Sequence, residues 1–106
     1  MQSKLARLLF FTVALAILIF ALLPASVRLP STGWDKSNHV LAFGVLAYMG
    51  CKAFPQSGYW LWGMLTMYGG VIEVLQYFTP SRSAEWADLL ADAIGALIGL
   101  KLAKWV

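Results

Sequence analysis

Apolar residues form four long runs along the chain, separated by short polar segments. The runs cover residues 5–23, 37–54, 59–79 and 86–105. Each is close to the roughly 20 apolar residues that a helix needs to cross the hydrocarbon core of a bilayer. Proline and glycine in the intervening segments favour loops. The pattern predicts an all-α integral membrane protein, in which one domain, residues 1–106, is a bundle of four antiparallel transmembrane helices.

Composition supports the same prediction. Hydrophobic residues make up 60% of the chain and charged residues 12%, whereas a soluble domain carries about a quarter charged residues. The basic residues are scattered rather than clustered on one face, so nucleic acid is not an expected partner. Every tryptophan lies at the end of a predicted helix, where indoles meet lipid head groups; a core of buried tryptophans is the alternative. These residues are Trp34, Trp60, Trp62, Trp86 and Trp105.

Basic residues are unevenly divided between the two ends of the predicted bundle. Lys4, Arg7, Lys52, Lys101 and Lys104 lie at one end, and Arg28, Lys36 and Arg82 at the other. Because the end richer in lysine and arginine faces the cytoplasm, both termini are predicted to be cytoplasmic in a multi-pass protein of the bacterial cytoplasmic membrane.

The first run also has features of a signal peptide. It is longer than the usual apolar region of one, and three spans follow, so we expect it to be retained as a helix.

Polar residues gather at the opposite, outer end of the predicted helices. They occur as pairs three or four residues apart, which places each pair on one helix face. A carboxylate facing lipid costs about 2.5–3.5 kcal/mol, so Glu73 should face the bundle interior and have a partner. Its candidate partners are Arg82, Lys36 and His39. The alternative is an ion-pair network that only holds the helices together. The candidate site residues are Asp35, Lys36, His39, Glu73, Gln76, Arg82, Asp88 and Asp92.

Small residues recur in the last two runs. Ala91, Gly95 and Gly99 are spaced four apart, and Gly69 with Gly70 lies about one turn before Glu73. Such spacing lets helix backbones approach closely in lipid. We expect these residues to pack the third helix against the fourth within one chain. A homo-oligomer that uses this face is the alternative and is not predicted.

Two segments resemble the VanZ-like membrane family. They read WDKSNHVLAF and GGVIEVLQYFTPSRSAEWADLLADAIGALIG, and the resemblance spans residues 34–100. The matching polar positions are Asp35, Lys36, His39, Glu73, Gln76, Arg82 and Asp88. Asp92 departs from the pattern, which has asparagine there. The resemblance implies a role in the cell envelope, and the family is named for a protein of teicoplanin resistance. Antibiotic resistance is thus suggested by resemblance alone.

Three classes of function fit these residues. Lys36, His39 and Arg82 could hold an anionic lipid head group, a lipid-linked phosphate or an envelope precursor. Alternatively, the chain is an intramembrane hydrolase or transferase, with catalytic candidates His39, Glu73 and Asp88. The third class is a proton- or ion-coupled transporter subunit, or a scaffold. We favour binding over catalysis, with membrane lipid as the expected partner.

No cofactor or metal is predicted. The chain has no glycine-rich phosphate loop, nucleophile elbow or HExxH helix. Oxygen ligands with His39 could hold a divalent ion, but no tight ligand spacing requires it. Cys51 is the single cysteine, so an intrachain disulfide is excluded, and we interpret it as a packing residue.

Overall fold

The computed structural model describes residues 3–22, 35–78 and 86–105, and the side chains of all of these except residues 3, 35–37 and 86. The described residues form four helices: α1 (Ser3–Leu22), α2 (Asp35–Ala53), α3 (Tyr59–Tyr77) and α4 (Trp86–Trp105). No strand occurs among the described residues. The prediction of an all-helical chain with four helices is therefore confirmed. The loops predicted around residues 24–36 and 80–86 lie outside the described residues except at their last positions. The structure places Asp35 and Lys36 in the first turn of α2 and Trp86 at the start of α4.

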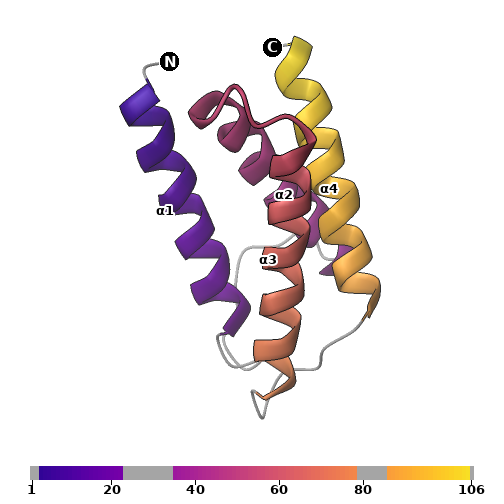
Figure 1. Ribbon diagram of the computed structural model, residues 1–106. Coiled ribbons are helices and arrows are strands. Elements are labelled where there is room, and N and C mark those ends of the chain that lie inside the picture. The colour runs from indigo at the N-terminus through magenta and orange to yellow at the C-terminus, as the bar shows by residue number, and fades with distance from the viewer. Residues whose placement is uncertain (1–2, 23–34, 79–85, 106) are drawn as a thin grey trace.

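The helices run alternately up and down, so the first residues of α1 and the last residues of α4 lie at the same end of the bundle (Figure 1). A tight turn joins α2 to α3 at this end. Phe54 N donates to Gly50 O at 2.8 Å, which closes the last turn of α2, and Ser57 Oγ donates to Phe54 O at 2.7 Å. Gly58 has a positive φ of 55°, which glycine adopts without the strain of a Cβ atom. The turn therefore reverses the chain within a few residues.

Helices α2 and α4 make the most extensive contact of the bundle. A Cβ atom on Gly95 would overlap the carbonyl oxygen of Val40, and one on Gly99 would overlap that of Gly44. The two glycines thus lie against the α2 backbone. The expectation that this face packs mainly against the third helix is wrong, although the contact is within one chain as predicted. Spacing shows that a face permits close approach, but it does not identify the neighbouring helix.

Gly69 and Gly70 of α3 do face α4, as the small-residue pattern predicted. A Cβ atom on Gly69 would lie 2.7 Å from Asp92 Oδ2, and one on Gly70 would lie 3.9 Å from Leu89 Cδ1. Trp62 Nε1 also donates to Ala93 O at 2.9 Å. The α3–α4 contact therefore combines small residues with a hydrogen bond between helices.

Apolar side chains cover both the inside and the outside of the bundle. Phe43, Leu46, Ile72 and Leu100 are among the buried core residues. Large apolar residues also point outward from every helix, at three- and four-residue spacing on α3 and α4. By length and composition, one helix within the described residues is apolar enough to cross a membrane, at Lys4–Leu22. The outward set includes Leu8, Phe11, Leu15, Leu41, Val45, Met64, Met67, Val71, Leu90, Ile94, Ile98 and Leu102.

Candidate functional site

Three helices bring polar side chains to one level of the bundle, near the end opposite the termini. We call His39, Glu73, Gln76, Asp88 and Asp92 the polar layer. Its carboxylates are strongly buried, with exposed fractions of 8% for Glu73, 3% for Asp88 and 0% for Asp92. Burying a charge is costly unless other groups compensate it. These side chains therefore need polar or charged groups close to them.

His39 lies between two aspartates of α4. Its Nδ1 is 2.7 Å from Asp92 Oδ1, and its Nε2 is 3.8 Å from Asp88 Oδ2. The aspartates are four residues apart, so both face α2 from consecutive turns. The 2.7 Å separation is that of a charge-assisted hydrogen bond, in which the ring N–H donates to the carboxylate. The contact at Nε2 is within ion-pair distance only. The imidazole is thus held from both sides by one helix.

Two glycines position Asp92 within the bundle. Gly69 leaves the space on α3 that the Asp92 carboxylate fills, because a Cβ atom there would lie 2.7 Å from Oδ2. On the other side, Gly95 lets α4 approach α2 at Val40, the residue after His39. Gly95 is three residues after Asp92, so the close approach occurs within one turn of the His39–Asp92 contact. Backbone packing therefore sets the distance between these side chains.

Glu73 reaches the same cluster from α3. One ligand atom each from His39, Glu73 and Asp92 can be chosen so that all three lie within 4.8 Å of one another. The prediction that Glu73 faces the bundle interior agrees with its burial, and His39 is one of the partners predicted for it. Charge on Glu73 is therefore placed beside an imidazole and a second carboxylate.

Gln76 connects the polar layer to α1. Its Nε2 donates to Ala21 O at 2.8 Å, and its side chain is only 3% exposed. The contact joins the ends of α1 and α3 on the side opposite the termini. Sequence reasoning identified Gln76 by its spacing from Glu73, but it gave no sign of the Ala21 carbonyl. Every residue of α1 has a backbone carbonyl, so the sequence does not indicate which one accepts this hydrogen bond.

Three predicted site residues cannot be placed in this cluster. Asp35 and Lys36 belong to the first turn of α2, but their side chains are not among those described, and Arg82 lies outside the described residues. The polar layer therefore consists of three carboxylates, one imidazole and the carboxamide of Gln76.

The opposite end of the bundle carries basic side chains that bridge neighbouring helices. Arg7 Nε is 3.4 Å from Ala53 O, and its guanidinium lies 5.3 Å from the Phe54 ring centroid. Lys52 Nζ is 3.4 Å from Ala103 O, and Lys104 Nζ lies 5.1 Å from the Tyr59 ring centroid. Arg7, Lys52 and Lys104 are three of the five basic residues assigned to this end. Among the side chains that the structure describes, this end is therefore basic, whereas the polar layer near the other end is rich in carboxylates.

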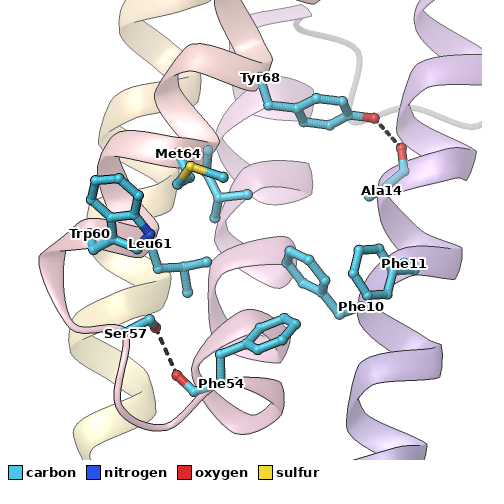
Figure 2. A pocket seen from close by; sticks show the side chains of 10 residues that line it. Phe10, Phe11, Ala14, Phe54, Ser57, Trp60, Leu61, Met64 and Tyr68 are labelled. Carbon is cyan, nitrogen blue, oxygen red and sulfur yellow. Dashed lines mark hydrogen bonds between the residues drawn. The ribbon is translucent and has the colours of Figure 1, made fainter.

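An apolar cavity of about 490 Å³ lies between α1 and α3 (Figure 2). Tyr68 closes one side of it, because its hydroxyl donates to Ala14 O across the gap. Sequence reasoning missed this cavity, because nothing in the apolar pattern distinguishes its lining residues from other apolar positions. Its lining residues are Phe10, Phe11, Ala14, Phe54, Ser57, Trp60, Leu61, Met64, Leu65 and Tyr68.

Comparison with known proteins identifies a family for the chain. The family model described as VanZ/LLP1 matches residues 3–106. No curated protein and no solved structure matches the chain significantly. The family match extends beyond the two quoted segments and includes α1.

Proposed function

Because the chain belongs to the VanZ/LLP1 family, we propose that it is a multi-pass protein of the bacterial cytoplasmic membrane that binds an anionic lipid head group. The ligand class includes lipid-linked phosphates and other envelope precursors. The observation that carries this proposal is the polar layer, which is buried inside a bundle whose outer surface is apolar.

The outer surface supports insertion of all four helices. On α4, Leu90, Ile94, Ile98 and Leu102 recur every four residues and are all between 46% and 62% exposed. The opposite face of that helix carries the buried Asp92. A soluble bundle shows the reverse pattern, with polar residues outside. An extended exposed apolar surface is instead typical of contact with lipid.

Charge at the two ends supports the orientation. Arg7, Lys52 and Lys104 gather at the end that holds both termini, and lysine and arginine favour the cytoplasmic side. The polar layer then belongs to the outer leaflet, at the depth of lipid head groups and the hydrocarbon just beneath them.

An anionic ligand requires positive charge, which Lys36 and Arg82 would supply. Arg82 has the planar fork of donors that suits a phosphate. Glu73 and Asp88 would orient these cations, which accounts for carboxylates in a site for an anion. The apolar cavity would hold part of the hydrocarbon chain, since Tyr68 is about 7.5 Å from Glu73 along α3.

Lipid binding by purified protein tests this proposal. Native mass spectrometry of detergent-solubilised protein with phosphatidylglycerol or phosphatidylcholine should show preference for the anionic lipid. Glu73→Gln and Arg82→Lys should each reduce that preference by about tenfold or more, because they remove an orienting charge and a bidentate donor. Arg7→Lys is the matched control at the opposite end and should bind like the wild type.

Equal binding of both lipids by the wild-type protein would contradict the proposal. So would wild-type preference in both Glu73→Gln and Arg82→Lys, measured on monodisperse protein. Competition by inorganic pyrophosphate would show that the phosphate groups, rather than the glycerol, are recognised. Expressing the wild-type and Glu73→Gln chains in a teicoplanin-susceptible strain tests the resistance role that the family resemblance suggests.

A second function, intramembrane hydrolysis or group transfer, is favoured by one specific contact. The 2.7 Å separation of His39 Nδ1 and Asp92 Oδ1 is the arrangement by which a carboxylate orients a histidine base. Incubating the wild-type protein with fluorescent phosphatidylglycerol and separating the products tests it. Product formation that His39→Gln abolishes would support catalysis, and unchanged lipid in the wild-type reaction would exclude hydrolysis of this substrate.

A further inference from the structure

We propose that His39, Glu73 and Asp92 bind one divalent transition-metal ion, Zn²⁺ or Mn²⁺, inside the polar layer. This inference goes beyond head-group binding, because it assigns the polar layer a resident ion. It is independent of which lipid the protein recognises.

The first argument is the convergence of donor atoms. His39, Glu73 and Asp92 belong to three different helices, and one ligand atom from each lies within 4.8 Å of the other two. Ligands of one zinc ion, with bonds of about 2.0–2.1 Å, are about 3.3 Å apart in tetrahedral geometry. Small rotations of the side chains would therefore close the donors around an ion. Three protein ligands leave a fourth position for water or another oxygen ligand.

The second argument is Asp88, which lies on the far side of the imidazole. A histidine that binds a metal through one ring nitrogen commonly gives its other N–H to a carboxylate, which fixes the ring orientation. Here Nδ1 faces Asp92, and Nε2 faces Asp88 Oδ2 at 3.8 Å. Nε2 is thus turned toward Asp88, at ion-pair rather than hydrogen-bonding distance. Nδ1 is then the nitrogen that would bind the ion, which would replace the proton now lying between Nδ1 and Asp92 Oδ1. The position of Asp88 is independent of the spacing among the three donors.

The third argument is charge. Glu73, Asp88 and Asp92 are each at least nine-tenths buried, and a buried carboxylate is stabilised by positive charge close to it. A divalent ion between Glu73 and Asp92 would supply such charge directly at two of the carboxylates. An imidazole nitrogen among the donors favours zinc, and the two carboxylates also suit manganese. Calcium and magnesium prefer oxygen ligands alone.

Metal titration of the wild-type protein is the primary test. Protein freed of its purification tag is stripped with a chelator in detergent and titrated with Zn²⁺, Mn²⁺, Mg²⁺ or Ca²⁺ by calorimetry, without added lipid. We expect one Zn²⁺ or Mn²⁺ per chain and at least tenfold weaker binding of Mg²⁺ and Ca²⁺. Co²⁺ should produce visible absorption bands from a site with nitrogen and oxygen ligands. The Co²⁺ spectrum uses only the wild-type chain, so it stays informative if a variant fails to fold.

Variants locate the ion within the polar layer. His39→Gln, Glu73→Gln and Asp92→Asn should each weaken Zn²⁺ binding at least tenfold. Asp88→Asn should weaken it by about tenfold, since it removes a group that orients a ligand. Thr66→Val is the control, because it removes a part-buried hydrogen bond within α3 without changing a proposed ligand, and it should bind Zn²⁺ like the wild type.

Two outcomes would overturn the inference. One is the absence of stoichiometric Zn²⁺ or Mn²⁺ binding to the wild-type protein. The other is wild-type affinity in His39→Gln, which would place the ion elsewhere. If either result were obtained while chelator-stripped protein still preferred anionic lipid, the metal site would be refuted and the lipid proposal would remain supported. Conversely, stoichiometric Zn²⁺ or Mn²⁺ binding by a protein that binds both lipids equally would refute the lipid proposal and leave the metal site supported.

Discussion

Replacing Gly95 with alanine should separate α2 from α4 and break the His39–Asp92 contact. The new methyl group would overlap the Val40 carbonyl oxygen and approach Val40 Cα to 2.8 Å. Both of those atoms belong to the backbone of α2, so a side-chain rotation cannot relieve the overlap. One helix must move away from the other by about 1 Å to restore van der Waals contact.

The expected cost follows from three effects. Overpacking of a well-filled interior costs about 1–3 kcal/mol, and loss of a buried hydrogen bond to a charged group costs about 1.5–3 kcal/mol. Alanine is a better helix former than glycine by about 1 kcal/mol, which offsets part of the loss. A net destabilisation of about 2–4 kcal/mol is expected. A displacement of about 1 Å would also lengthen the 2.7 Å His39–Asp92 separation beyond hydrogen-bonding range.

Reversible unfolding in mixed detergent micelles measures this effect, and Gly63→Ala provides the control. Gly63 also lies in a helix, but nothing lies within 4 Å of a Cβ atom placed there. Its replacement should be neutral or stabilising by about 1 kcal/mol. If Gly95→Ala were as stable as Gly63→Ala, α2 and α4 would not pack backbone to backbone, and the account of how Asp92 is positioned would be wrong.

Two further predictions concern orientation and the contact between α3 and α4. Single cysteines are introduced at Ser31 and Ser83 in a chain whose Cys51 is replaced by serine. Both should react with a membrane-impermeant thiol reagent in intact cells. Reaction at both sites only after the membrane is opened would reverse the proposed orientation. Trp62→Phe removes the 2.9 Å hydrogen bond to Ala93 O and should lower the free energy of unfolding by about 0.5–1.5 kcal/mol in the same micelles. Trp105→Phe is the control, because Trp105 is 86% exposed, and it should have little effect on that free energy.

The number of helices and the inward direction of Glu73 could be predicted from the sequence, because both depend on local patterns. Apolar runs set where helices begin and end, and the cost of a lipid-facing carboxylate determines which way Glu73 points. The i,i+4 spacing of Asp88 and Asp92 also placed both on one helix face. These arguments need no knowledge of which helices are neighbours.

The pairing of α2 with α4 could not be predicted, because glycine spacing is the same whichever helix approaches. Gly95 and Gly99 accept any backbone of suitable shape, and the neighbour they meet is set by the arrangement of all four helices. The His39–Asp92 contact depends on that arrangement, since the residues are 53 positions apart. The proposed metal ligands are likewise distributed over three helices, so no local ligand spacing marks them.

Asp92 is where packing and chemistry impose opposite demands on one side chain. It is fully buried, with Gly69 beneath its carboxylate and His39 beside it, so a negative charge there opposes folding unless something compensates it. An asparagine side chain at this position would keep the shape and still accept a hydrogen bond from the His39 ring.

If the charge serves function, Asp92→Asn should be stable to within about 1 kcal/mol of wild type, or more stable, while it loses Zn²⁺ affinity. If the carboxylate only holds the helices together, the same substitution should cost about 3–5 kcal/mol, the loss expected on breaking a buried ion pair. Unfolding of chelator-stripped protein distinguishes these outcomes, and a loss of that size would contradict a functional role for the charge.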